Sequence, residues 1–314
     1  MTGSKVIRIA SRGSRLALTQ AESVRRRLAV AWPDQRFEIV TIETVGDRVL
    51  DRPLPEIGGK GLFTEELEAA LLAGDVHVAV HSLKDLPTDL PEGLKVGAVC
   101  EREDPRDAWV ARGGGAGALA LAAAGARIGT SSERRRAQVL ALRPDLEVAA
   151  VRGSVETRLR KLDEGLYDAL IMAAAGLVRL GLSERVTSFL EPPAWLPAAG
   201  QGALAVESRA DDAATDALLV AIEDPVARAE TDAERALLTT LQGGCQVPVG
   251  ARAEAEGEDL ILHALVATPD GAQLVRAEGR GPRENAVKLG IEVAYDLLSR
   301  GGEAIVAAFR EPVR

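Results

Sequence analysis

The sequence predicts an α/β protein with two α/β domains followed by a smaller α+β domain. Three observations predict this: a length of 314 residues, short apolar segments that alternate with amphipathic helical patterns, and a different pattern after Pro225. A chain of this length exceeds what one hydrophobic core usually spans. Because hydrophobic residues make up 46% of the chain, a sizeable core is available in each domain.

The first series of elements follows the order strand, helix, strand. Strands are expected at residues 6–10, 37–42, 76–80 and 94–99, where the sequence is apolar or alternating. Helices are expected at 16–30 and 62–73, where apolar residues recur with helical spacing. This order is typical of βαβ units.

A second series begins after residues 104–107 and predicts a second α/β domain. Its expected strands lie near residues 108–111, 127–129, 146–151 and 168–173, and its expected helices near 132–142 and 154–164. A proline-rich segment at 191–197 favours a hinge, and residues 203–207 favour one more buried strand. The third domain is expected to have a helix from Pro225, strands near 247–253, 260–267 and 273–278, and a long helix at 284–300.

Charge and cysteine content exclude several classes of protein. A net charge of -9 and a pI near 5.1 argue against nucleic acid or an anionic membrane as the main partner. No segment approaches the roughly 18 apolar residues that a membrane span needs, so we expect a cytoplasmic protein. Cys100 and Cys245 lie far apart, outside any metal-ligand spacing, and we expect free thiols and no metal site.

Three turns between a predicted strand and a predicted helix combine glycine, hydroxyl and arginine residues. They are residues 11–14, 129–132 and 152–154. A helix N-terminus disfavours cations, yet Arg134, Arg135 and Arg136 directly follow Ser132. An anion held by N–H groups, hydroxyls and guanidinium groups would explain this placement. Alternatively, Ser14, Ser132 and Ser154 are simple N-caps and the arginines are solvated.

Two further segments are candidates for a site. Residues 81–85 place His81, Ser82, Lys84 and Asp85 at the end of an apolar strand, where four polar side chains are not expected in a core. Lys84 suits anion binding or imine formation, and Asp85 suits proton transfer or stabilisation of a cation; a surface ion pair is the alternative. Residues 57–61, with Lys60 among three glycines, indicate either a closing loop or a linker.

Cys245 lies in a glycine turn between a predicted helix and a predicted strand. A buried structural cysteine is expected within an apolar segment, as Cys100 is, whereas Cys245 stands among polar and glycine residues. It could be a nucleophile, although no histidine is near it in sequence, or a thiol that anchors a group covalently.

Several motifs together resemble porphobilinogen deaminase, and the resemblance covers the chain from about Val6 to the C-terminal helix. They are His81-Ser82-Leu83-Lys84-Asp85, Glu101-Arg102-Glu103-Asp104-Pro105-Arg106-Asp107, Gly129-Thr130-Ser131-Ser132, Pro197-Ala198-Ala199-Gly200-Gln201-Gly202 and Gly243-Gly244-Cys245-Gln246-Val247-Pro248. The resemblance implies two doubly wound α/β domains that resemble type II periplasmic-binding-protein domains, plus a small α+β C-terminal domain. The expected bounds are 1–101 with 203–220, 106–196, and 225–314, with hinge segments 102–105 and 197–202.

The resemblance implies a monomeric transferase of porphyrin biosynthesis. It would join four porphobilinogen molecules into linear hydroxymethylbilane, with loss of ammonia at each addition. One dipyrromethane cofactor per chain would be bound as a thioether to Cys245, and the partners would be porphobilinogen and the growing oligopyrrole chain. Asp85 resembles the catalytic carboxylate, which would contact pyrrole N–H groups and stabilise the cation formed on loss of ammonia.

The pyrrole rings carry acetate and propionate groups, so the resemblance also supplies the anion for the three turns. Residues that resemble the family's cofactor contacts are Ser82, Lys84, Asp85, Thr130, Ser132, Arg134, Arg135, Arg152 and, through its backbone N–H, Gly153. Residues expected to contact substrate are Arg12, Ser14, Lys60, Arg158 and Arg179.

The chain departs from the family at two positions. Glu56 stands where a basic residue is often found, and Ser154 where Asn is common. Two other classes of protein remain open at this point. A ligand-binding protein would close on a small anion without chemistry, and a different cysteine-dependent transferase would expose a reactive thiol.

Overall fold

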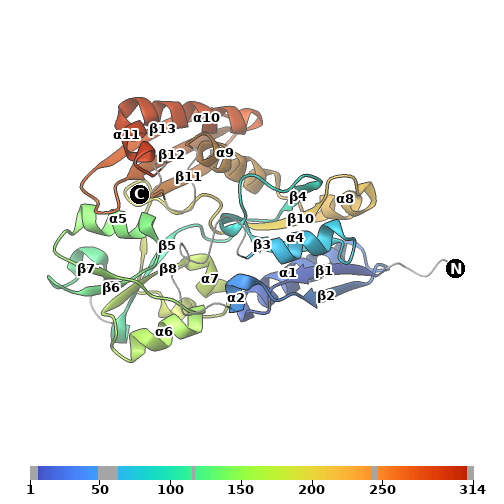
Figure 1. Cartoon of the computed structure of the whole chain (residues 1–314), viewed down its shortest axis with the longest axis horizontal. Helices are drawn as coiled ribbons and strands as arrows, with labels where there is room; N and C mark the ends of the chain where they lie inside the picture. Colours follow the sequence, from blue (N-terminus) through green and yellow to red (C-terminus); the bar gives the residue numbers. More distant parts are fainter. Residues whose placement is uncertain (1–5, 49–62, 115–116, 242–246, 310–314) are drawn as a thin grey trace. The chain divides into compact units, whose positions relative to one another are not determined.

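A computed structural model describes residues 6–48, 63–114, 117–241 and 247–309. Contacts divide the chain into two compact units. Figure 1 labels the helices and strands of both. Residues 1–103 and 202–228 form the first unit, and residues 104–201 and 229–314 form the second.

The first unit contains a five-stranded sheet in the order β2-β1-β3-β10-β4. Its elements are β1 (Ile7–Ser11), α1 (Arg15–Ala31), β2 (Phe37–Thr41), α2 (Val45–Arg48), α4 (Glu65–Leu72), β3 (Val78–Ser82), β4 (Leu94–Val99), β10 (Leu204–Arg209) and α8 (Ala213–Leu219). Strands β2, β1 and β3 are parallel, whereas β10 runs antiparallel to β3 and β4.

Helices cover both faces of this sheet. Successive strand residues point to opposite faces, and both faces carry apolar side chains that helices bury. Val24 and Leu28 of α1 pack in one apolar cluster with Ile9 and Val80. Leu67 and Leu71 of α4 pack in another cluster that contains Ala79. The adjacent positions 79 and 80 of β3 therefore face different helices, which is the arrangement of a doubly wound sheet.

The larger sheet of the second unit has the order β7-β6-β8-β5-β9. Its elements are β5 (Asp107–Ala111), β6 (Arg127–Gly129), α5 (Glu133–Leu142), β7 (Glu147–Ala149), α6 (Val155–Asp163), β8 (Ala169–Ala173), α7 (Ala174–Arg179) and β9 (Ser188–Leu190). Strands β7, β6 and β8 are parallel, and β5 is antiparallel to both neighbours. Both large sheets thus share one pattern of pairing, with an antiparallel fourth strand, and the predicted fold class is confirmed.

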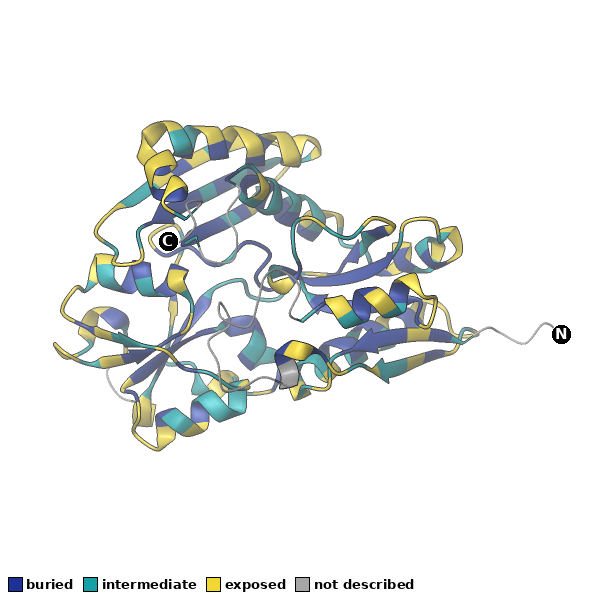
Figure 2. Cartoon of the chain, in the orientation of Figure 1, coloured by how far each residue is buried: buried dark blue, intermediate teal, exposed yellow. Residues whose placement is uncertain are grey.

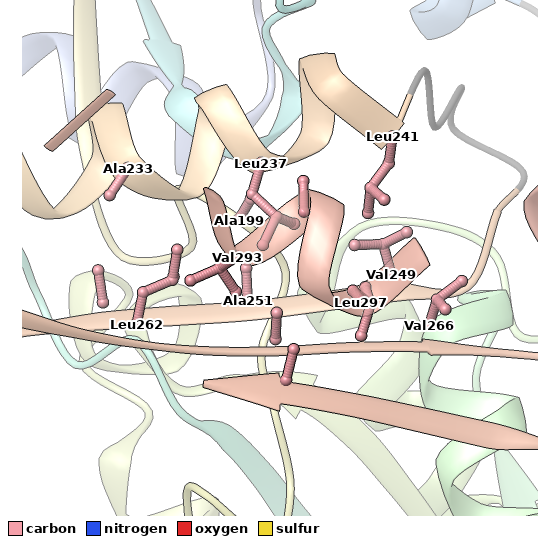
Figure 3. Packing of buried hydrophobic residues seen from close by; sticks show 14 of the residues in the cluster. Ala199, Ala233, Leu237, Leu241, Val249, Ala251, Leu262, Val266, Val293 and Leu297 are labelled. Carbon is pink, nitrogen blue, oxygen red and sulfur yellow. The ribbon is translucent and has the colours of Figure 1, made fainter. Parts of the chain in front are cut away.

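A three-stranded antiparallel sheet, in the order β11-β12-β13, completes the second unit. The strands are β11 (Val249–Glu256), β12 (Asp259–Ala267) and β13 (Leu274–Pro282). The helices of this part are α10 (Ala286–Leu297), α11 (Glu303–Ala307) and α9 (Pro225–Leu241), of which residues 225–228 belong to the first unit. Figure 3 shows Leu237 and Leu241 of α9 and Val293 and Leu297 of α10 packed with residues of this sheet. The two helices come very close at Gly290, where a Cβ atom would lie 2.2 Å from the carbonyl oxygen of Ala233.

Burial follows the position of each strand (Figure 2). The central strands β3, β10, β5 and β8 are buried over most of their length, whereas the edge strands β2 and β7 are largely exposed or half-buried. One of the most buried strands, β3, therefore leads directly into the turn at Leu83–Asp85.

Some predicted elements differ from the observed ones. The helix expected at 284–300 ends at Leu297, and a π-helical turn with a kink at Gly301 (φ 109°) separates it from α11. The short elements β9, α7 and α8 were not expected. The division of residues 106–196 and 225–314 into separate domains stays a prediction, since two sheets share the second compact unit.

Candidate active site

The turn after β3 carries the candidate residues Ser82, Lys84 and Asp85. Ser82 ends the strand, and Lys84 and Asp85 lie in a 3-10 helix at Leu83–Asp85. Ser82 and Lys84 are half-buried and Asp85 is exposed, whereas Leu83 between them is buried. The turn is therefore anchored by one apolar side chain, and Asp85 is its exposed polar residue.

His81 differs from the expectation that the polar residues here lie outside the core. It belongs to β3 and only 6% of it is exposed. Its Nε2 lies 3.0 Å from Oε2 of Glu207 on β10. The sequence interpretation was wrong at this position because the polar partner comes from a strand 126 residues further along the chain.

The first of the three turns joins β1 to α1. Ser14 caps α1 by accepting a hydrogen bond from the N–H of Ala17 at 3.3 Å, and the first turn of the helix contains no acidic residue. Arg12 is half-buried, with its guanidinium carbon 4.1 Å from the centre of the Phe63 ring. Ser14 is thus an N-cap, and Arg12 lies just before a helix whose first turn has no acidic residue.

The second turn joins β6 to α5. Thr130 Oγ1 accepts a hydrogen bond from the N–H of Ser132 at 3.2 Å, and Ser132 caps α5 by accepting from the N–H of Arg135 at 3.4 Å. Both serine and threonine therefore shape the backbone of the turn, whatever else they bind.

Arg134 and Arg135 point into the protein, where each is 6% exposed. Asp107, at the start of β5, is fully buried and accepts hydrogen bonds from both: from Arg134 Nη1 at 2.7 Å and from Arg135 Nη2 at 2.7 Å. Trp195 Nε1 and Gln201 Nε2 also donate to Asp107, at 2.8 and 2.9 Å. The anion that the arginine cluster required is thus supplied, in part, by the protein itself.

The electrostatics of this cluster favour an ionised Asp107. Burial alone would raise the pKa of its carboxyl, but the adjacent guanidinium groups of Arg134 and Arg135 outweigh burial and hold that pKa well below its usual range. Two cations against one buried anion leave a net positive charge beneath the N-terminus of α5. Such a charge favours the approach of an anion to this turn.

The third turn joins β7 to α6 and depends on a glycine. Gly153 has φ 112°, and a Cβ atom there would lie 2.6 Å from Cγ2 of Thr157. Ser154 caps α6 by accepting from the N–H of Thr157 at 3.2 Å, and Arg158 Nε donates to the Gly153 carbonyl at 2.8 Å. Nη1 of Arg152 is buried and has no hydrogen-bond partner among the described residues.

The hydroxyl of Ser131 connects the second turn to the third. Ser131 Oγ donates to the carbonyl of Val151 at 2.8 Å and lies 3.1 Å from the N–H of the same residue. Because β6 and β7 are parallel neighbours, their carboxyl ends lie at one edge of the sheet. Thr130, Ser132, Arg152 and Gly153 are thereby brought together. Arg179 ends α7, which follows the next strand, β8.

Cys245, Lys60 and Glu56 lie outside the described residues. The elements that flank Cys245 are α9, which ends at Leu241, and β11, which begins at Val249. In the described part of the chain no helix is long and apolar enough to cross a bilayer. Nor do three or more His, Cys, Asp or Glu side chains gather there in a way that could hold a metal ion.

Comparison with known proteins assigns the chain to a family. A family model described as "Porphobilinogen deaminase, dipyromethane cofactor binding domain" matches residues 7–217, and one described as "Porphobilinogen deaminase, C-terminal domain" matches residues 229–299. The chain belongs to the porphobilinogen deaminase family. A porphobilinogen deaminase from Syntrophobacter fumaroxidans is 50% identical over 302 residues, which cover 96% of this chain and 97% of that protein.

The chain is also similar to solved structures at low sequence identity. A lipoprotein of the YaeC family from Enterococcus faecalis is 12% identical, with a TM-score of 0.42, over 70% of this chain and 92% of that one. The periplasmic aliphatic sulphonate binding protein SsuA from Escherichia coli is 12% identical, with a TM-score of 0.40, over 97% and 77%. Values this low carry no argument about function.

Three residues of the site were missed by sequence reasoning. Asp107 was quoted in a motif without a role, although a carboxylate that opens an apolar strand requires a partner. Glu207 was taken as the end of a buried strand. Gln20 lies buried on α1 and donates to Ser82 Oγ at 2.9 Å. The sequence feature that could have indicated its role is its place as a polar residue on the apolar face of a helix.

Proposed function

We propose that this chain is the transferase that joins four porphobilinogen molecules head to tail into hydroxymethylbilane and releases ammonia at each addition. The match of both family models in order, and 50% identity over nearly the whole chain, support this activity. The observation that carries the choice of ligand is the buried Nη1 of Arg152, without a protein partner in the described residues, at a turn built by Gly153 and Ser154. A guanidinium in this position suits a carboxylate.

We further propose that Cys245 binds a dipyrromethane cofactor as a thioether, one per chain. When bound, this group would supply the primer to which new pyrrole units are added. Residues of the linked second and third turns, together with the turn after β3, fit its acetate and propionate groups. They are Thr130, Ser132, Arg134, Arg135, Arg152, Gly153, Ser82 and Lys84.

Arg134 and Arg135 would act on the cofactor mainly through charge. Five of their hydrogen bonds are already made to Asp107, to the carbonyl of Leu196 and to the carbonyl of Ile171. They can therefore add favourable potential for a carboxylate without leaving their buried positions. Arg152, at the linked third turn, is better suited to a direct contact.

Asp85 would be the catalytic residue. Its exposed position at the end of a buried strand leaves its carboxylate able to accept a hydrogen bond from a pyrrole N–H of substrate. A carboxylate also stabilises the positive charge that develops when ammonia leaves. Arg12, Ser14, Lys60, Arg158 and Arg179 would hold the carboxylates of the incoming porphobilinogen and of the growing oligopyrrole chain.

A monomer in a reducing compartment such as the cytoplasm fits this activity, because a thiol must stay free until the cofactor is attached. The proposal is tested by intact mass and by turnover. The purified protein should exceed the mass of its polypeptide by two linked pyrrole units, and Cys245→Ser should lack that mass. Cys100→Ser is the matched control and should keep it.

Turnover is measured as ammonia release and as hydroxymethylbilane formed from porphobilinogen. A wild-type protein that is active without added mass would contradict covalent attachment. A loaded protein that releases no ammonia from porphobilinogen would contradict the activity itself.

A further inference from the structure

Two buried ionisable side chains lie beside the turn that carries Asp85, within the first unit. Nε2 of His81 is 3.0 Å from Oε2 of Glu207, and the exposed fractions of the two side chains are 4% and 0%. His81 is the last residue but one of β3, and Glu207 lies within β10. The pair therefore joins two strands immediately before Ser82.

The strand register places both side chains on one face of the sheet. His81 stands opposite Ala205, and Glu207 stands opposite Ala79, so the two positions are two residues apart. Glu68 of α4 is also buried, and the charges of His81 and Glu207 both affect its pKa. Burial raises the pKa of Glu68, and the neighbouring charge of Glu207 raises it further, while His81 acts in the opposite direction.

Stability does not explain these residues. Oε1 of Glu207 and Oε1 of Glu68 are buried and have no hydrogen-bond partner among the described residues. Each buried, unpaired polar atom costs about 1–3 kcal/mol. Replacement of a buried ion pair by apolar residues of similar size is often neutral or stabilising. The adjacent residues Val80 and Val206 indicate that apolar side chains suit these strands.

We propose that His81 and Glu207 are positioning residues that fix the turn Ser82–Asp85 for the deaminase reaction. The inference rests on the proposed function, in which Asp85 contacts the substrate. The backbone ladder between β3 and β10 ends at Ser82 and Leu204. The hydrogen bond between the side chains of His81 and Glu207 joins the same two strands, and on β3 it lies one residue before Ser82. It therefore holds the strands together where the turn leaves the sheet.

The expected effect follows from the geometry of catalysis. A displacement of about 1 Å at a reacting group can cost on the order of 100-fold in rate. The groups proposed to hold the substrate's carboxylates lie largely in other turns, so their contribution to binding should persist. Loss of the pair should therefore lower kcat and leave KM nearly unchanged.

The test is the double variant His81→Leu with Glu207→Met, which removes both members of the pair. We expect a urea midpoint equal to or above that of the wild type, full cofactor mass, and a kcat about 10-fold lower. A merely structural pair predicts the opposite: a lower midpoint and normal kcat in the folded protein. The matched control is His263→Leu with Glu278→Met, which removes a partly exposed pair of the same 3.0 Å distance between β12 and β13 and should leave kcat unchanged.

If the double variant does not carry the cofactor mass, two single variants of Glu207 are compared instead. Glu207→Gln keeps an acceptor for the Nε2–H of His81 and should retain most of kcat, whereas Glu207→Ala should lose about 10-fold. The inference would be overturned by wild-type kcat in the loaded double variant, by equal kcat in the two single variants of Glu207, or by a change confined to KM. Failure of the proposed function is separate, since it would appear in the wild type as absent cofactor mass or absent turnover.

Discussion

Replacement of Asp107 by asparagine tests whether the buried arginine pair depends on this carboxylate. The side chain of Asp107 is fully buried and accepts from Arg134, Arg135, Trp195 and Gln201, at 2.7 to 3.1 Å. Asparagine keeps one oxygen acceptor but removes the charge, and leaves two buried guanidinium groups without a counter-ion.

The magnitude follows from the burial of the pair. Removal of one partner of a buried ion pair costs about 3–5 kcal/mol, because the remaining charge is left uncompensated. The asparagine side chain can still accept one or two of the hydrogen bonds, so we expect a loss of about 3 kcal/mol in the free energy of unfolding. This is a large part of the ~5–15 kcal/mol that a domain usually has.

The pH dependence has a definite sign. The pKa of Asp107 is lower in the folded protein than in the unfolded chain, so its stabilising contribution is complete above the unfolded value and is lost as the pH falls toward the folded value. The difference between wild type and Asp107→Asn should be constant from about pH 6 to about pH 8 and should shrink only below about pH 4.

Urea unfolding at about pH 7.5, followed by circular dichroism, measures this difference. Asp145→Asn is the control, since it removes an exposed carboxylate that pairs with Arg143 at 2.6 Å and should have a far smaller effect. A loss below about 1 kcal/mol for Asp107→Asn, in the range of a surface pair, would refute the reasoning.

Three further changes test other parts of the structure. Asp85→Asn should leave the urea midpoint and cofactor mass unchanged and abolish most ammonia release; normal turnover would remove Asp85 from the mechanism. Gly153→Ala should cost about 2 kcal/mol in urea unfolding, because φ 112° is strained for alanine and its Cβ would collide with Thr157; an unchanged midpoint would contradict this. Glu68→Gln should stabilise the protein by about 1 kcal/mol at about pH 8, where the raised pKa makes ionisation costly, and by little at about pH 4; equal effects at both pH values would contradict a raised pKa.

Local patterns predicted the elements and turns well because they depend on neighbouring residues. The alternation of apolar residues located β1 to β8, and Ser14, Ser132 and Ser154 cap helices as the N-cap alternative stated. The helix expected at 284–300 was too long, because Leu298–Gly302 form a π-helical turn instead of continuing α10.

Pairings between distant residues could not be predicted from the sequence. His81 looked like part of a polar turn because its partner, Glu207, lies on β10, which follows residues 104–201 of the second unit in the sequence. The arginines after Ser132 indicated an anion. Asp107 lies 27 residues before Arg134, and nothing in the sequence around it indicates with which arginine it pairs. The roles of Cys245 and Lys60 stay predictions, since neither is among the described residues.

The hydroxyl of Ser131 has a consequence for how a ligand with several carboxylates binds. Because Ser131 is hydrogen-bonded to both polar groups of Val151, the second and third turns are ordered relative to each other when the protein folds. A carboxylate held at one turn then places the next carboxylate of the same molecule at a high effective concentration near the other turn. Little further ordering of the protein is needed, so the second contact adds more to affinity than it would between two independent loops.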